Sequence, residues 1–287
     1  MQAALKKRDT RVQIVIVENG RYILLKHLAK KENTTFWGLP GGGREPHETD
    51  EEAAIREALE ETGLDVQLLP IKHEVQITGK TFIYNRIVTF MAFPVAGEAK
   101  TGSEPEESLY ESYNYSLIGL KWQVLDDDGD LETFTRRSVE PVREMLRMAP
   151  LGKKAGCALY RRENGSLRVL LSRRPDENHR FDLPRWDVRP GESPEEVVKR
   201  EIRDSWGVNI SNPSHTGFFF HHDGKDFYRN DIFSFPLAPD DPIPGDEMLL
   251  WVDARQAGTM CLSRESRQII DEMEVPLKQK GTHYAGF

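Results

Sequence analysis

Residues 41–63 read GGGREPHETDEEAAIREALEETG, and this stretch decides the fold of the first half of the chain. Three glycines open the stretch, and Gly63 closes it. Thr49 with Glu52 three residues later is a capping-box pattern, which predicts a helix that begins directly after Thr49. The helix is expected to run to about Thr62 and to end at Gly63. We therefore predict a glycine-rich loop followed by one acidic helix.

The acidic side chains of this helix share one face. At about 100° per residue, Glu57, Glu60 and Glu61 fall within an arc of roughly 100°. Three carboxylates so placed repel one another, and a hard divalent cation relieves that repulsion. Because the donors are all oxygen atoms, Mg²⁺ or Mn²⁺ is the expected ion rather than zinc. The opposite stripe of the helix is expected to face the core and consists of Ile55, Ala58, Leu59 and Thr62.

Residues around the helix complete a candidate metal site. The glycines allow the backbone to approach closely, and the Gly42 carbonyl is a candidate for a further metal ligand. Arg56 is expected to pair with Glu48 and so to hold the loop onto the helix. The alternative is a solvated acidic helix face with surface ion pairs, which is the usual explanation of a glutamate-rich stretch. That alternative requires neither the glycines nor Glu48 at a fixed distance, so the metal site is favoured.

The chain repeats itself at a shift of 144 positions, which places Leu39-Pro40 on Leu183-Pro184 and Gly63 on Gly207 without a gap. Charged residues that repeat at this shift include Glu48 on Glu192, Arg56 on Arg200 and Glu57 on Glu201. Each copy has about 140 residues, which is enough to bury a core of its own. We therefore predict two domains, residues 1–150 and residues 151–287.

Each copy is predicted to contain the same kinds of elements. In the first copy, two strands at 12–17 and 22–25 are joined by the hairpin turn Asn19-Gly20. Residues 82–93 should add strands, and a last helix is expected at 140–148. The second copy repeats the capped helix from Ser193-Pro194 to Gly207 and has a last helix at 263–273. Because strands and helices are mixed without βαβ regularity, the predicted class is α+β with mixed sheets.

Composition narrows the functional classes. The 287 residues carry a formal net charge of −8, which argues against a general nucleic-acid or membrane-surface binder. Cys157 and Cys261 are too few for a disulfide framework and too far apart for a zinc site. The N-terminus lacks the apolar segment of a signal peptide, and no apolar run approaches the roughly 20 residues of a membrane span. A cytoplasmic location is expected, and a homodimer is compatible with the sequence.

The acidic helix and its loop carry a complete known pattern, G-x5-E-x7-R-E-U-x-E-E-x-G-U, where U is an apolar residue. The residues that match are Gly42, Glu48, Arg56, Glu57, Glu60, Glu61 and Gly63. This is the signature of the Nudix hydrolases, and the chain resembles that family. Ala58 departs slightly, because the family usually has a larger apolar residue there. The resemblance implies two tandem Nudix-type α/β/α sandwich domains, of which the first has the intact motif.

The resemblance also implies an activity, the Mg²⁺-dependent hydrolysis of a pyrophosphate linkage in a nucleoside diphosphate derivative. Carried over by position, Glu57 and Glu61 are the main metal ligands, and Glu60 is a further ligand or a base that orients water. Glu48 and Arg56 are then structural. A nucleoside triphosphate is preferred as substrate over ADP-ribose, a nucleotide sugar or a dinucleoside polyphosphate. The alternative of another class is a non-catalytic nucleotide sensor, which would not need a complete set of three carboxylates.

Other candidate residues in the first copy are less specific. Lys26, at the end of the second strand, is a candidate ligand for a substrate phosphate, although an edge-strand lysine often serves only solubility. In some Nudix members the general base lies on a later loop, where this chain has Glu107 and Glu111, and an acidic solvated loop is the competing interpretation. Trp37 is expected to pack in the core. The aromatic residues able to stack on a base are Tyr84, Tyr113 and Tyr115.

The second copy keeps the frame of the motif and loses its ligands. Trp186 stands in place of Gly42, Asp204 in place of Glu60, and Ser205 in place of Glu61. A serine removes one anionic donor, and an indole blocks the close approach of the loop, so weak metal binding is predicted. We interpret this copy as a degenerate domain that supports the first. A ligand-binding domain and a second active site remain the alternatives. The nearby histidines His215, His221 and His222 are expected on the surface or in loops.

Overall fold

The chain divides into two compact units, Met1–Pro150 and Leu151–Phe287. The computed structural model describes residues 9–77, 84–102, 114–129, 131–173, 181–238, 241, 248–257, 259–260 and 263–274. Within these residues, no helix is long and apolar enough to cross a membrane.

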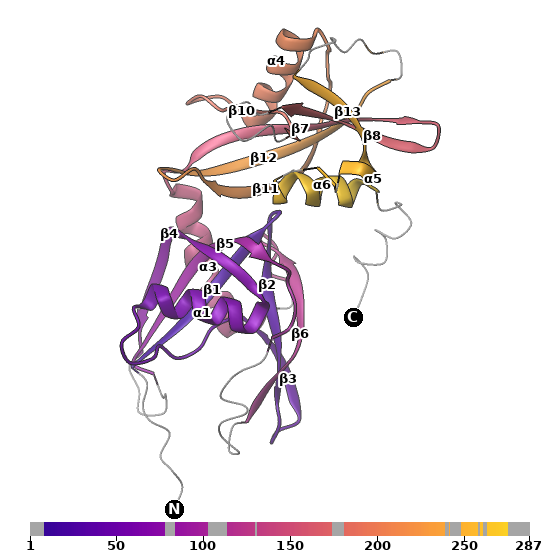
Figure 1. The fold of residues 1–287 in the computed structure, drawn as a ribbon. Coiled ribbons are helices and arrows are strands. Elements are labelled where there is room, and N and C mark those ends of the chain that lie inside the picture. The colour runs from indigo at the N-terminus through magenta and orange to yellow at the C-terminus, as the bar shows by residue number, and fades with distance from the viewer. Residues whose placement is uncertain are drawn as a thin grey trace, which may run out of the picture. The chain divides into compact units, whose positions relative to one another are not determined.

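The first unit is a mixed sheet between two helices (Figure 1). Its elements are β1 Thr10–Glu18, β2 Arg21–Ala29, β3 Thr34–Gly38, α1 Asp50–Thr62, β4 Leu64–Gln76, β5 Arg86–Gly97, β6 Tyr115–Val124 and α3 Thr133–Met148. The strand order is β3-β2-β1-β5-β4, and β6 pairs with β2. The β1–β5 pair is parallel and the other pairs are antiparallel. The predicted α+β class with a mixed sheet is confirmed.

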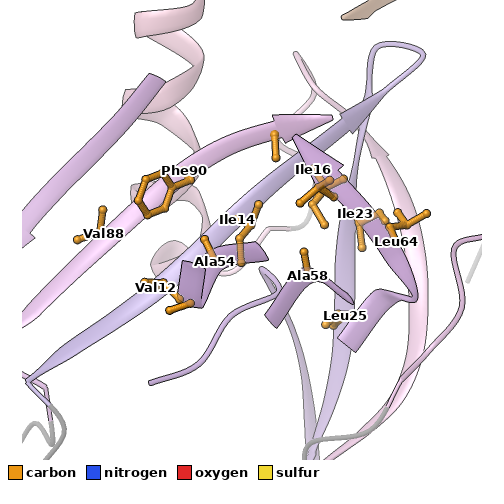
Figure 2. Close-up of a cluster of buried hydrophobic side chains, with 13 residues drawn as sticks. Val12, Ile14, Ile16, Ile23, Leu25, Ala54, Ala58, Leu64, Val88 and Phe90 are labelled. Carbon is orange, nitrogen blue, oxygen red and sulfur yellow. The ribbon is translucent and has the colours of Figure 1, made fainter. Parts of the chain in front are cut away.

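Alternating residues of β1 determine which helix covers each face of the sheet. Ile14 and Ile16 pack in one buried cluster with Ala54 and Ala58 of α1 (Figure 2). On the opposite face, Gln13 Oε1 accepts a hydrogen bond of 2.8 Å from Ser138 Oγ of α3. Burying a large aliphatic side chain such as these isoleucines contributes about 1.5–3 kcal/mol. The two helices thus make the outer layers of an α/β/α sandwich.

The orientation of α1 corrects one expectation. Ile55 and Leu59 are 42% and 47% exposed, so they do not face the core. The buried residues of α1 include Glu57 and Glu61, together with the small alanines and Thr62. Small alanine side chains let the helix axis come close to the sheet. The carboxylates of Glu57 and Glu61, beside these alanines, then face inward against the glycine loop. Of the predicted apolar stripe, only Ala58 and Thr62 are buried.

The second unit repeats this topology. Its elements are β7 Gly152–Glu163, β8 Ser166–Arg173, β9 Phe181–Asp182, β10 Arg185–Asp187, α4 Pro194–Trp206, β11 Ser214–His222, β12 Phe227–Pro236, β13 Leu249–Asp253, α5 Ala254–Ala257 and α6 Arg264–Glu274. The strand order β11-β12-β7-β8-β13, with β9 on β8, is the order of the first unit with each strand replaced by its counterpart. The β7–β12 pair is parallel, as the β1–β5 pair is.

Individual backbone hydrogen bonds also recur between the units. The Ile14 N–H donates to the Pro40 carbonyl at 2.9 Å. In the second unit, the Cys157 N–H donates to the Pro184 carbonyl at 3.1 Å. Both α1 and α4 begin with a complete capping box and end at a glycine in the left-handed conformation. The internal repeat of the sequence therefore corresponds to a repeat of the structure.

Candidate active site

Local sequence fixes where α1 begins and ends. The Thr49 side chain accepts a hydrogen bond from the Glu52 N–H at 3.1 Å, and Glu52 Oε2 accepts one from the Thr49 N–H at 2.8 Å. At the other end, Gly63 has φ 70°, and its N–H donates to the Leu59 carbonyl. A glycine adopts that φ without the steric cost that a Cβ would bring. The predicted boundaries of the helix are confirmed.

The glycine loop is attached to both the sheet and the helix. The Gly42 carbonyl accepts a hydrogen bond of 2.9 Å from the Val12 N–H, so the loop runs beside β1. The Gly41 N–H donates to Glu61 Oε2 at 2.7 Å. A buried carboxylate that accepts a backbone N–H is held in one orientation. The loop therefore positions Glu61 directly.

Glu57 lies against the same loop, at a point where a side chain on the loop would displace its carboxylate. A Cβ added at Gly42 would lie 2.3 Å from Glu57 Oε1, inside any ordinary contact distance. Glu57 and Glu61 are 4% and 2% exposed, which is rare for glutamate. The missing side chain at Gly42 thus leaves the space that the Glu57 carboxylate occupies.

Arg56 connects the carboxylates. Its Nε donates to Glu48 Oε1 at 2.7 Å, and its Nη1 donates to Glu57 Oε1 at 2.9 Å and to Glu60 Oε2 at 3.0 Å. The hydrogen bonds to Glu48, together with the neighbouring Glu57, raise the pKa of Arg56 above its ordinary value. The expected pairing of Arg56 with Glu48 is present. A single guanidinium thus contacts three carboxylates, and the buried Glu61 adds a fourth carboxyl group on the same helix.

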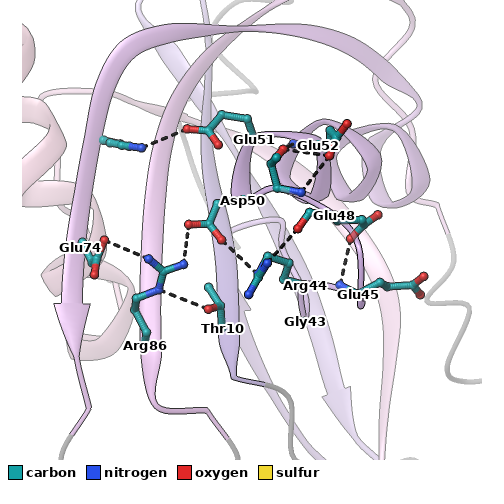
Figure 3. A network of polar contacts seen from close by, with 12 residues as sticks. Thr10, Gly43, Arg44, Glu45, Glu48, Asp50, Glu51, Glu52, Glu74 and Arg86 are labelled. Carbon is teal, nitrogen blue, oxygen red and sulfur yellow. Dashed lines mark hydrogen bonds and ion pairs between the residues drawn. The ribbon is translucent and has the colours of Figure 1, made fainter.

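A second network, which the sequence reasoning missed, holds the start of α1 to the sheet (Figure 3). Asp50, the first residue of α1, pairs with Arg44 of the loop at 3.2 Å and with Arg86 of β5 at 2.5 Å. Arg86 also contacts Glu74 of β4 at 3.2 Å. These residues are far apart in sequence, and the only local signal was an acidic residue in the first turn of a helix, which is generally favourable.

The donors present fit a hard divalent cation. Glu57 and Glu61 are one helical turn apart, both are buried, and both face a loop that supplies only backbone groups. Within the described residues, no group of three His, Cys, Asp or Glu side chains is arranged to hold an ion by itself. Mg²⁺ is typically bound by one or two carboxylates, with water and substrate phosphates as the other ligands. A two-carboxylate site matches that preference, whereas a closed zinc site would need four protein ligands.

The remaining candidates of the first unit that the structure describes lie away from this site. On β2, Leu25 packs on the α1 side of the sheet, so the next residue, Lys26, lies on the opposite face. Tyr84 contacts Arg11, and Tyr115 packs edge-on against Phe36 with its ring centroid 6.0 Å away. The candidates that lie outside the described residues are Glu107, Glu111 and Tyr113.

The second unit keeps the arginine pairing of the first unit. Arg200 pairs with Glu192 and also with Glu201, the latter at 2.9 Å. The side chain of Glu201 is 28% exposed, whereas that of Glu57 is 5% exposed. Glu201 is therefore not enclosed by the loop in the way that Glu57 is.

Indole rings occupy the corresponding region of the second unit. The Trp186 ring lies 5.8 Å from the Trp206 ring, centroid to centroid. Asp204 is exposed and pairs with the neighbouring Arg203 at 2.9 Å. Trp186 lies on β10, which pairs with β7, and packs against the buried cluster that includes Trp206. By sequence it takes the place of Gly42, so an apolar ring stands where the first unit has a bare glycine.

The histidines of the second unit lie on a strand. His221 and His222 are consecutive, partly exposed residues of β11 and point to opposite faces. His215, also on β11, contacts the buried Asp231 at 3.0 Å. Arg229 contacts the same carboxylate at 2.9 Å. These histidines were expected on the surface or in loops; they lie on a strand, where His215 is exposed and the other two are partly exposed.

Comparison with known proteins places the first unit in a family. Residues 7–131 match the family model described as NUDIX domain. A relative from Mycobacterium tuberculosis, named "Putative 8-oxo-dGTP diphosphatase 3", is 44% identical over 54 residues, which are 18% of this chain and 25% of the relative. The "mRNA-decapping protein g5R" of African swine fever virus is 30% identical over 137 residues, which are 45% of this chain and 53% of that protein.

A solved structure, the MutT NUDIX hydrolase of Burkholderia pseudomallei, is 27% identical and covers 48% of this chain and 99% of its own, with a TM-score of 0.34. The chain spans a quarter to about half the length of these two curated relatives. The family model covers both the glycine loop and the helix that carries Glu57 and Glu61. Residues 7–131 of this chain therefore form a domain of the Nudix family.

Proposed function

We propose that the first unit hydrolyses a pyrophosphate linkage in a nucleoside diphosphate derivative with the help of Mg²⁺ or Mn²⁺. The observation that carries the proposal is the pair of buried carboxylates, Glu57 and Glu61, against a loop in which Gly42 has no room for a side chain. Carboxylates buried side by side are costly to fold, so a function that uses these two groups is favoured.

Each residue has a separate part in the proposed reaction. The divalent ion, when bound, neutralises the diphosphate and acidifies the attacking water. Glu57 and Glu61 hold that ion, and the Gly41 N–H and Arg56 fix their orientations. Glu60, whose side chain is 32% exposed, lies at the edge of the pair, where it serves as a further ligand or accepts the proton of the attacking water. Glu48 acts through Arg56 and is a positioning residue.

The reaction adds one water across one phosphoanhydride bond. The water oxygen forms a new bond to one phosphorus atom, the bond from that phosphorus to the bridging oxygen breaks, and the bridging oxygen leaves with the other phosphate. A nucleoside triphosphate gives a nucleoside monophosphate and pyrophosphate. We propose this substrate class first, and the name of the Mycobacterium relative, an 8-oxo-dGTP diphosphatase, supports it. ADP-ribose, nucleotide sugars, dinucleoside polyphosphates and capped RNA are the further substrates to test.

We propose that the second unit does not hydrolyse these substrates. Ser205 replaces the second carboxylate, and Trp186 with Trp206 fills the region beside the helix with apolar rings. A divalent ion would then have one partly exposed carboxylate, Glu201, which also pairs with Arg200. A structural role for this unit is the simplest proposal.

A substrate screen with matched variants tests the proposed function. The full chain is incubated with each nucleotide class and Mg²⁺, and mono-, di- and pyrophosphate products are separated and quantified. We expect turnover that disappears in excess chelator and falls by about 10²-fold or more in Glu61→Gln, which removes one anionic ligand at nearly constant shape. Glu48→Gln should cost less, because it acts only through Arg56.

The rival function, a non-catalytic nucleotide sensor, predicts a different result. A sensor would bind one of these nucleotides with no product formed, and the variant Glu57→Gln with Glu61→Gln would alter affinity alone. Turnover in the wild-type protein that persists in excess chelator would overturn the metal-dependent mechanism. Binding without turnover across the whole panel would favour the sensor.

A further inference from the structure

A tryptophan with two lysines lies on the face of the first sheet that α1 does not cover. The Lys121 Nζ is 4.6 Å and the Lys26 Nζ is 5.9 Å from the centroid of the Trp37 ring. Lys26 and Trp37 are direct cross-strand partners on β2 and β3. Lys121 of β6 is the partner of Leu24, two residues before Lys26, and so shares their face. We call these three residues the Trp37 patch.

The patch is separate from the proposed hydrolytic site. Leu25 of β2 packs against the alanines of α1, while Lys26 follows it and points away from that helix. Helix α3 holds the backbone at Trp37, because the Thr135 hydroxyl donates a hydrogen bond of 2.8 Å to the Trp37 carbonyl. The backbone at Trp37 is therefore anchored, and its indole ring is partly buried.

The lysines of the patch lack the acidic partners that other lysines of the chain have. Lys72 pairs with Glu51 at 3.0 Å, and Lys199 pairs with Glu195 at 2.6 Å. Among the residues that the structure describes, neither Lys26 nor Lys121 forms an ion pair. In a chain with a net charge of −8, two such ammonium groups over one indole make a local positive region. Both ammonium groups lie near the indole ring, so a phosphate that they bind would also lie near that ring.

We propose that the Trp37 patch binds a nucleobase that carries phosphate, at a second site that is distinct from the hydrolytic one. The base stacks on the indole, and the phosphates pair with Lys26 and Lys121. An indole that stacks a base beside lysines that neutralise phosphate is the combination by which proteins hold nucleotides and single strands without reading sequence. A free nucleotide and a single-stranded nucleic acid present the same chemistry, and the experiment separates them.

The test measures binding in excess chelator, so that the metal-dependent site does not contribute. The probes are a fluorescein-labelled single-stranded RNA of twelve nucleotides, read by anisotropy, and adenosine monophosphate, read by competition and by quenching of tryptophan fluorescence. The Lys26→Gln with Lys121→Gln variant should weaken binding by at least about tenfold, and for the strand it should lower the salt slope by about 1.4. Trp37→Leu should remove the quenching on its own.

The matched control removes the same charge elsewhere. Lys72→Gln with Lys199→Gln takes away two lysines that are already paired, and it should leave binding and the salt slope near the wild-type values. Hydrolysis by the Lys26→Gln with Lys121→Gln variant should equal that of the wild type, so this proposal and the proposed hydrolysis fail or succeed independently.

The two probes also distinguish a single-stranded nucleic acid from a free nucleotide as the ligand. Tight strand binding with weak competition by adenosine monophosphate identifies a single strand, and comparable affinities identify a free nucleotide. The proposal is overturned if neither probe binds, if the control variant loses as much affinity as the patch variant, or if a polyglutamate peptide of equal charge competes as well as the RNA does.

Discussion

Replacing Gly42 with alanine gives a sharp test of the proposed metal site. The new Cβ would lie 2.3 Å from Glu57 Oε1, and ordinary contact begins near 3.4 Å, so the carboxylate must retreat by about 1 Å. Misplacing a catalytic group by that distance costs about 10²-fold in rate, or about 2.7 kcal/mol in activation free energy. We expect kcat of Gly42→Ala to fall by this factor, and the Mg²⁺ concentration for half-maximal rate to rise.

The same substitution should leave the fold intact. Gly42 is not in the left-handed region, unlike Gly41 with φ 147°, so an alanine there is not strained by its backbone. The atoms that the Cβ meets belong to the end of a flexible side chain, which is able to move. Because alanine also restricts the unfolded chain, the free energy of unfolding should change by less than about 1 kcal/mol. Loss of activity without loss of stability is therefore the expected signature.

The assay follows product release by the wild-type protein, Gly42→Ala and Gly119→Ala over a range of Mg²⁺ concentrations, with urea denaturation of each. Gly119 is the control, because an added Cβ there meets only the Lys26 Cβ at 3.6 Å, an ordinary contact. If Gly42→Ala turned over within about threefold of the wild type at limiting Mg²⁺, the close approach of the loop to Glu57 would have no part in catalysis.

Three further outcomes are expected. Glu201→Gln should leave kcat within about twofold of the wild type in the product assay, since the second unit has Ser205 where the first has Glu61. A loss equal to that of Glu61→Gln would show that the second unit is catalytic. Leu59→Gln should change the free energy of unfolding in urea by less than about 0.5 kcal/mol, because the Leu59 side chain is exposed. Ala58→Leu should lower this free energy by about 1–3 kcal/mol, because Ala58 is fully buried. Burial raises the pKa of the Cys157 thiol, so iodoacetamide at pH 8 should modify it in urea and not in the native protein, as read by peptide mass spectrometry.

Sequence patterns predicted the local features well, because those features depend on neighbouring residues. The capping box at Thr49 and the stop at Gly63 each involve contacts within one or two helical turns. The pairing of Arg56 with Glu48 also followed from spacing alone. The repeat in the sequence likewise corresponds to two units with one topology.

Features that depend on how distant segments pack together were not predictable in this way. The outward face of Leu59 was missed, because helical periodicity assigns carboxylates to water and leucines to the core. Lys26 was placed at the site, because the strand pattern does not say which face of the sheet α1 covers. The contacts of Asp50 with Arg44 and Arg86 join three separate segments, and no local rule connects them.

The second unit also bears on how such proteins are recognised in genomes. Arg200 still pairs with Glu192 and Glu201, although the positions of Gly42 and Glu61 have changed to tryptophan and serine. One short motif thus contains two sets of residues, one that ties the loop to the helix and one that we propose holds the metal ion. After a gene duplication the two sets can diverge. A search that rewards the first set alone would count two enzymes in this chain, whereas the proposal made here, based on the other positions, counts one.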